Sequence, residues 1–225
     1  MIALKAPVGA KQRLAGVLTQ SQRRLVALAL GARCLRCAMR TWPTGRVVVV
    51  GAGEEVAELA ARHGVGAVLS DPGSGQSAAV AIGARWVVGQ GLDRLVTVAG
   101  DLPDVREDDL RWLRRLAEDL GGPGVVAVPD TAGTGTNALV VRPATADVLA
   151  FGPDSIARHR ARAMALGLPF SVAGRPTLAR DCDRPEDLRA ILAGGDGALR
   201  GLIDGGGPPT LGRVATPPPP GRDHP

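Results

Sequence analysis

Lysine is almost absent from this chain. Only two of its 27 cationic residues are lysines, and both fall within the first eleven residues, at Lys5 and Lys11. A chain that uses arginine nearly everywhere, yet keeps two lysines in one segment, indicates that compact ammonium groups are needed there. Residues 5–13 are therefore a candidate binding segment.

Long apolar runs, paired cysteines and basic blocks with aromatic residues are missing as well. No run of about 18 apolar residues occurs, which excludes a transmembrane helix. Three cysteines do not indicate a disulfide framework, and the first residues lack a signal-peptide pattern. The expected location is the cytoplasm.

The net charge of +5 comes without a Lys/Arg block or aromatic platform, so we expect neither nucleic acid nor a membrane as a partner. A small polyanionic substrate suits this charge.

Short apolar segments alternate with amphipathic helical ones. Strands are expected at residues 2–4, 46–50, 67–69, 95–99, 125–129, 137–142 and 170–173. Helices are expected from a cap at Thr19 or Ser21 to about 39, at 54–63, 77–88, 107–120 and 155–166, and finally from Pro185. The alternation predicts an α/β fold with a single doubly wound, mainly parallel sheet. We assign residues 1–204 to one domain and expect 205–225, rich in Gly and Pro, to be a disordered tail.

Carboxylates follow the expected central strand and recur near the end of the domain. Asp101 comes directly after the apolar segment 95–99, and Pro103 prevents that strand from continuing. Asp181 and Asp183 alternate in an extended segment, so both side chains point to one face. Three such carboxylates can hold hard divalent cations. The alternatives are a turn or cap role for Asp101 and capping of the last helix by Asp183.

Glycine- and hydroxyl-rich turns supply candidate anion sites. The loop with Gly73 and Gly75 opens a helix and presents backbone N–H groups to a phosphate or a base edge, although an ordinary connection is equally compatible. Thr136, Gly152 and Ser155 bring hydroxyls and N–H groups close to another helix N-terminus. Cations for phosphates, carboxylates for Mg²⁺ and an anion pocket together favour nucleotidyl transfer.

These segments resemble a known family. Residues 5–14 are similar to the V-K-x4-A-K-[ST]-R-L opening of the phosphoenolpyruvate or 2-phospho-L-lactate guanylyltransferases of coenzyme F-420 biosynthesis. Ser77 stands where we expect Asn, and Gln76 where Leu is common. The resemblance covers about residues 2–192, and the remaining segments match in the same order: 71–73, 100–103, 135–139, 151–155 with 158–159, and 181–188.

The resemblance implies a nucleotide-diphospho-sugar-transferase-like, Rossmann-like fold and a set of site roles. Asp101, Asp181 and Asp183 would hold Mg²⁺. The phosphorylated three-carbon acid would be bound by Thr136, Gly152 and Ser155. The GTP phosphates would be contacted by Lys5, Lys11 and Arg13, which with Asp101 form the catalytic set, and the nucleotide would lie near Gly73, Gly75 and Ser77.

The expected reaction is transfer of GMP from GTP to the phosphate of phosphoenolpyruvate or 2-phospho-L-lactate, with release of pyrophosphate. Alternatives are the same transfer to 3-phosphoglycerate, a cytidylyl- or sugar nucleotidyltransferase of the same fold, and a non-catalytic nucleotide-binding module. A homodimer is compatible with all of them.

Overall fold

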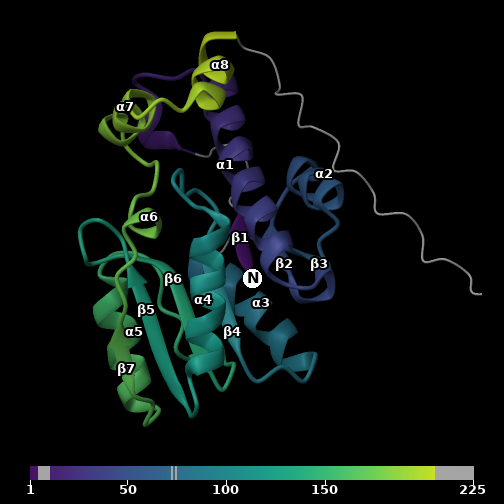
Figure 1. The fold of residues 1–225 in the computed structure, drawn as a ribbon, viewed down its shortest axis with the longest axis vertical. Helices are drawn as coiled ribbons and strands as arrows, with labels where there is room; N and C mark the ends of the chain where they lie inside the picture. Colours follow the sequence, from purple (N-terminus) through teal and green to yellow (C-terminus); the bar gives the residue numbers. More distant parts are fainter. Residues whose placement is uncertain (5–10, 72, 74, 206–225) are drawn as a thin grey trace, which may run out of the picture.

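A computed structural model describes residues 1–4, 11–71, 73 and 75–205 (Figure 1). The strands form one sheet and are β1 (Ile2–Leu4), β2 (Val48–Gly51), β3 (Ala67–Ser70), β4 (Leu95–Ala99), β5 (Gly124–Pro129), β6 (Thr136–Arg142) and β7 (Phe170–Val172). The helices are α1 (Gln20–Thr41), α2 (Glu54–His63), α3 (Gln76–Gly89), α4 (Glu107–Asp119), α5 (Ser155–Ala165), α6 (Pro176–Ala179), α7 (Pro185–Ala193) and α8 (Gly197–Gly205), with 3-10 turns η1 (Gln12–Leu14) and η2 (Thr44–Arg46).

The sheet has the order β3-β2-β1-β4-β6-β5-β7, and all pairings are parallel except those of β6, which runs antiparallel to β4 and β5. From β1 the chain moves outward to β2 and β3, then crosses to β4 on the other side of β1. The strand order therefore reverses between β1 and β4. This arrangement confirms the predicted doubly wound, mainly parallel sheet.

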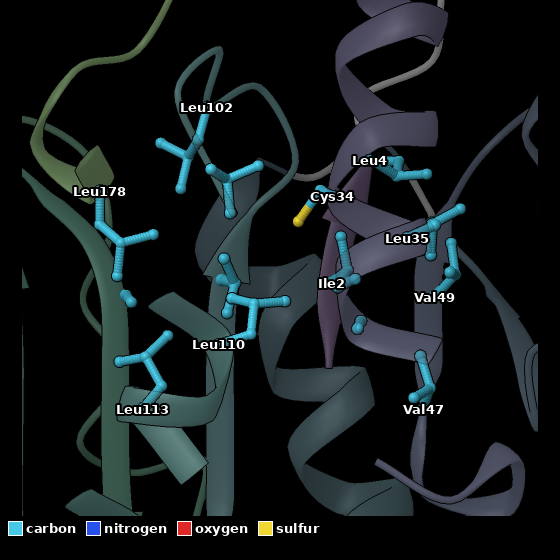
Figure 2. Close-up of a cluster of buried hydrophobic side chains, with 14 of the residues drawn as sticks. Ile2, Leu4, Cys34, Leu35, Val47, Val49, Leu102, Leu110, Leu113 and Leu178 are labelled. Carbon is cyan, nitrogen blue, oxygen red and sulfur yellow. The ribbon is translucent and has the colours of Figure 1, made fainter. Parts of the chain in front are cut away.

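Helices cover both faces of the sheet. On one face α1, α2 and α4 pack on β1, β2 and β4. Figure 2 shows part of this cluster, which includes Ile2 of β1, Cys34 and Leu35 of α1, and Leu110 and Leu113 of α4. On the other face α3 and α5 pack on β4, β5 and β6. Because most strand residues are buried on both faces, the strands are nearly continuous apolar runs.

The first helix begins where its capping residues predict. Thr19 is the N-cap of α1, and its hydroxyl accepts the Gln22 N–H at 3.2 Å while the Gln22 side chain accepts the Thr19 N–H at 2.8 Å. This reciprocal pair satisfies two N–H groups at the start of the helix. Thr19 is therefore the cap, and Ser21 lies inside the helix.

The end of the described chain differs from the expectation. The helix at Pro185 is followed by α8, although glycine is frequent there. Leu199 and Leu202 of α8 are buried against α1 and α7 in a third apolar cluster, and Figure 1 shows α7 and α8 beside the beginning of α1. Tertiary burial thus overrides the low helix propensity of glycine. Apart from Gly205, the expected tail lies outside the described residues.

No helix in the described part of the chain is both long and apolar enough to cross a membrane.

Candidate active site

A cavity of about 690 Å³ opens at the carboxyl ends of β1 and β4. This is the point where the strand order reverses, which is where open α/β sheets bind ligands. Gly100 lets the two strand ends approach, because a Cβ at that residue would lie 2.8 Å from the Ala3 carbonyl oxygen. Asp101, two residues past the end of β4, consequently lines the cavity.

Lys11 joins two acidic residues that are distant in the sequence. Its Nζ donates to Asp101 Oδ2 at 2.6 Å and to Asp183 Oδ1 at 3.0 Å, and its side chain is only 5% exposed. Burial alone would lower the pKa of Lys11, but the two carboxylates outweigh burial and raise the pKa above its usual value. Arg13 lies at the rim, 3.8 Å from Asp183 Oδ2. The ammonium of Lys11 is therefore a fixed positive charge between two negative ones.

Asp181 lines the same cavity. Cys182, between Asp181 and Asp183, is fully buried in the opposite direction, among α1, α7 and α8. Extended backbone sends alternate side chains to opposite sides, so Asp181 and Asp183 both face the cavity. Burial, followed by the negative charges of Asp101 and Asp183, raises the pKa of Asp181 to about 6. We call Lys11 and these three aspartates the acidic end of the cavity.

Asn137 anchors the segment that carries the two later aspartates. It lies on β6 and is buried, and its Nδ2 donates to the carbonyl oxygens of Leu178 at 3.0 Å and Ala179 at 2.8 Å. One side-chain amide thereby satisfies two carbonyls at the end of α6. The fold thus sets the position from which residues 181–183 reach the cavity.

A buried carboxylate holds the other side of α6. Asp109 of α4 is 1% exposed and accepts hydrogen bonds from Thr177 Oγ1 at 2.6 Å and Arg175 Nε at 2.7 Å. It also accepts the Arg106 backbone N–H at 2.8 Å. A buried charge with several donors is well satisfied, so Asp109 fixes α6 against α4 without contributing to the cavity wall.

The start of α7 shows that Asp183 is not needed as a cap. The carboxylate of Asp187 accepts the backbone N–H groups of Asp183 at 3.1 Å and Arg184 at 2.7 Å, and Arg184 is the N-cap residue. The capping alternative for Asp183 is therefore wrong, because Asp187 performs that role from inside the helix.

The donor set at the acidic end suits a hard divalent cation. Its ligating atoms would be carboxylate oxygens, which Mg²⁺ prefers. In the part of the chain that the structure describes, no three Asp, Glu, His or Cys side chains are arranged as a formed metal site. Lys11 bridges Asp101 and Asp183, and Arg13 also pairs with Asp183, whereas burial and the neighbouring carboxylates raise the pKa of Asp181. These residues fit a metal that adds charge there.

The loop before α3 forms another part of the wall. Gly73 and Gly75 both line the cavity with left-handed backbone, φ 76° and 96°. The Gly73 N–H donates to Asp71 Oδ1 at 2.9 Å. Ser77, in contrast, is not among the described lining residues, because its hydroxyl donates to the Phe151 carbonyl at 3.2 Å. The neighbouring Gln76 lines the cavity in its place.

Thr136, Ser155 and Gly152 also line the cavity. Ser155 Oγ donates to Thr136 Oγ1 at 2.8 Å, and Ser155 is the first residue of α5. Gly152 has φ 115° and Asp154 has φ 53°, so the loop turns sharply into the helix. The first N–H groups of a helix lack intrahelical partners and favour anions. We call Thr136, Ser155 and the start of α5 the hydroxyl end.

An apolar wall completes the cavity and was missed from the sequence. Leu28 of α1 and Val56 and Leu59 of α2 line it, together with Val50 of β2. Their helical and strand periodicity predicts core residues only, and no local pattern marks them as lining a site. From the sequence, Asn137 is expected only as the first residue of a strand and within the matched segment 135–139, with no role of its own. Lys5, an expected phosphate contact, lies outside the described residues.

Comparisons with known proteins identify the class. Residues 19–185 match the MobA-like NTP transferase domain family. A protein from Desulfovibrio desulfuricans G20 that is assigned as a nucleotide-diphospho-sugar transferase has a similar fold, with a TM-score of 0.60 and 16% identity over 88% of this chain and 95% of that one. A 4-diphosphocytidyl-2C-methyl-D-erythritol synthase from Anaerococcus prevotii has a TM-score of 0.58 and 9% identity over 85% and 92%. The chain is a nucleotidyltransferase with the expected nucleotide-diphospho-sugar-transferase-like fold.

Relatives narrow the class further. A phosphoenolpyruvate guanylyltransferase from Sphaerobacter thermophilus is 36% identical over 81% of this chain and 86% of its own length. One from Rubrobacter xylanophilus is 36% identical over 87% and 93%. The chain belongs to the phosphoenolpyruvate guanylyltransferase family.

Proposed function

We propose that this protein transfers GMP from GTP to the phosphate of phosphoenolpyruvate, or of 2-phospho-L-lactate, as a step of coenzyme F-420 biosynthesis. An oxygen of the acceptor phosphate forms a bond to the α-phosphorus of GTP, and the bond from that phosphorus to the bridging oxygen breaks. Pyrophosphate leaves. The observation that carries the proposal is one cavity that is lined both by Lys11, Asp101 and Asp183, which meet through two ion pairs, and by Thr136 and Ser155, in a chain of this family.

The reaction needs little acid–base chemistry from the protein. Phosphate oxygens are already anionic at neutral pH, so catalysis consists of positioning and charge neutralisation. Asp101, Asp181 and Asp183 would hold Mg²⁺, whose charge would lower the cost of bringing anionic groups together. Lys11 and Arg13 line the same end and would stabilise the departing pyrophosphate. We assign Lys5 to the same role from the sequence.

The hydroxyl end would bind the acceptor. Thr136 and Ser155 offer hydroxyls, and the loop from Gly152 into α5 offers backbone N–H groups. A small dianionic or trianionic acid suits such donors. Gly73 and Gly75 would lie along the nucleotide, and the apolar wall formed by α1 and α2 offers a surface on which a base can be buried.

The proposal is tested by incubating the protein with GTP, Mg²⁺ and phosphoenolpyruvate, 2-phospho-L-lactate or 3-phosphoglycerate separately. Pyrophosphate release and the product mass are followed. We expect release with phosphoenolpyruvate or 2-phospho-L-lactate and a product heavier than the acid by one GMP moiety. Preference for CTP or UTP over GTP would overturn guanylyl transfer in favour of a related nucleotidyltransferase. Nucleotide binding without pyrophosphate release for any of the three acids would indicate a non-catalytic module.

Removing Mg²⁺ with EDTA in the same assay should abolish pyrophosphate release, and adding Mg²⁺ back should restore it.

Gel filtration with light scattering tests the homodimer that this proposal allows. We also propose that the protein acts in the cytoplasm.

A further inference from the structure

A short chain of polar atoms leads from the cavity into the protein interior. Ser155 Oγ lies 2.8 Å from Thr136 Oγ1, which lies 3.2 Å from Nδ1 of His159. His159 is on α5, one turn after Ser155, and is fully buried. Thr136 and Ser155 line the cavity, whereas His159 is not among the described lining residues. The hydrogen bond to Thr136 is therefore the polar contact that connects His159 to the cavity.

His159 is neutral in this environment. Burial, followed by the charges of Arg162 and Arg158, lowers the pKa of His159 to about 4. Its ring meets Phe151 edge-to-face, with centroids 4.8 Å apart. A neutral imidazole has one N–H and one bare nitrogen, so the hydrogen-bond chain depends on which nitrogen carries the proton.

The unpaired ring nitrogen decides between the two tautomers. Nε2 of His159 is buried and has no hydrogen-bond partner among the described residues. An orphaned buried N–H is rarer in proteins than an under-satisfied acceptor, which favours a bare Nε2 and a proton on Nδ1. The opposite tautomer would bury an unpaired Nε2–H and would turn the hydroxyl of Thr136 inward, toward Nδ1.

We propose that His159 is a positioning residue that donates its Nδ1–H to Thr136 Oγ1 and thereby turns the Thr136 hydroxyl proton into the cavity. Thr136 Oγ1 then accepts from both His159 and Ser155, and its own proton is directed to a molecule bound in the cavity. This inference rests on the proposed function, because the anion it would serve is the phosphate or carboxylate of the phosphorylated acid. It assigns His159 no part in the chemistry at the α-phosphorus.

The tautomer is tested directly by ¹⁵N NMR of the histidine-labelled protein at neutral pH, with the His159→Phe variant used to assign the signal. Protonated and bare ring nitrogens have well separated ¹⁵N shifts. We expect a protonated Nδ1 and a bare Nε2 for His159. A protonated Nε2 overturns the proposal. This measurement needs neither substrate nor turnover.

Kinetics of two variants tests the consequence. An asparagine at this position can present an N–H donor near the place of Nδ1, whereas phenylalanine keeps the ring volume without a donor. His159→Phe should raise KM for phosphoenolpyruvate about tenfold or more, the usual effect of losing a hydrogen bond to a charged group. KM for GTP should change less than about twofold, and His159→Asn should recover most of the loss. Equal effects of Asn and Phe, or equal effects on both substrates, would contradict the proposal.

A double variant separates positioning from packing. With Thr136→Val in place, the further change His159→Phe should leave phosphoenolpyruvate binding unchanged, because the hydroxyl that His159 orients is gone. Binding of phosphoenolpyruvate alone, measured by calorimetry, gives the same comparison without turnover. If no acid is converted to product, yet Nδ1 is protonated and the Asn and Phe variants differ in binding, the proposed function fails and this inference stands.

Discussion

At the acidic end of the cavity, Lys11 meets carboxylates 90 and 172 residues away in the sequence, whereas at the hydroxyl end Thr136 contacts partners only 19 and 23 residues away. The first end consists of charges that come together only when the sheet is complete. The second consists of neutral groups at one strand and the following helix. The acidic end should therefore respond to changes of charge and to cations, and the hydroxyl end to the direction of single hydrogen bonds.

The largest effect is expected from removing a charge at the acidic end. Asp101→Asn keeps the size of the side chain but removes a negative charge that would hold Mg²⁺. The rate of pyrophosphate release with GTP and phosphoenolpyruvate should fall about 100-fold or more, as it does when one preorganised electrostatic group is lost.

Asp93→Asn is the matched control for Asp101→Asn. Asp93 lies near the opposite end of β4, half exposed, and pairs with Arg142 at 2.7 Å. Because exposed ion pairs contribute little to stability, the turnover of Asp93→Asn should stay near that of the wild type. A folded Asp101→Asn protein with near-normal turnover would remove Asp101 from the catalytic set.

The second-largest effect is a loss of stability at low pH, caused by His159 behind the hydroxyl end. The pKa of His159 is lowered from 6.5 to about 4, so the unfolded chain binds a proton between these values and the folded one does not. Stability is therefore fully present above pH 6.5 and is lost as pH falls toward 4. Between pH 7 and pH 5 the wild type should lose about 2 kcal/mol relative to His159→Asn, measured by urea unfolding.

Taking the difference between wild type and His159→Asn removes other titrating groups, Asp181 included, from this measurement. Arg158 and Arg162 are the charged groups that lower the pKa of His159 besides burial. If the two proteins lose stability in parallel across this range, His159 titrates normally and its burial does not keep it neutral.

Most of the fold could be predicted from the sequence, because strand and helix signals here are local. Thr19, with Gln22 three residues later, marks the start of α1, and the apolar run at 95–99 followed by Pro103 marks the end of β4. Alternation in an extended segment likewise predicts that Asp181 and Asp183 share a face, and the buried Cys182 lies between them. Helix α8 could not be predicted in this way, because it depends on packing against α1 rather than on its own glycine-rich composition.

Many polar residues that line the candidate cavity could be predicted from the sequence, but the contacts among them could not. Nothing local in the sequence indicates that Lys11 pairs with Asp101 and Asp183, since both contacts depend on long-range topology. His159 reads as an isolated histidine, and only the fold places it behind Thr136. The Ser77 hydroxyl is likewise kept out of the cavity by a tertiary contact, its hydrogen bond to the Phe151 carbonyl.

A smaller effect is expected from replacing Lys11, and it shows whether the lysine charge competes with a bound cation or assists it. In the absence of nucleotide, the Lys11 ammonium competes with a divalent cation for Asp101 and Asp183. Lys11→Met should therefore tighten Mn²⁺ binding about tenfold, the equivalent of one partly buried ion pair of about 1.4 kcal/mol, while pyrophosphate release falls. Free Mn²⁺ is measured by electron paramagnetic resonance.

Arg13→Met is the control for Lys11→Met, because Arg13 is 68% exposed and lies 3.8 Å from Asp183. Mn²⁺ affinity of that variant should change less than about twofold. Unchanged or weaker Mn²⁺ binding by Lys11→Met would mean that the lysine assists the cation site rather than competing with it.

The smallest effect is expected from substitutions at Gln76 and Ser77, where the loop before α3 enters the helix. Ser77 donates to the Phe151 carbonyl and so joins this loop to the hydroxyl end, while Gln76 lines the cavity. Ser77→Ala should lower the free energy of unfolding by about 1 kcal/mol, the usual value of one hydrogen bond, and leave KM for GTP nearly unchanged. Gln76→Ala should instead raise KM for GTP, because it removes a group from the wall. The contrary result would be that Ser77→Ala alters the preference for GTP over CTP more than Gln76→Ala does. Nucleotide selection would then depend on the Ser77 hydroxyl, which would exchange its contact with Phe151 for one with the base when GTP binds.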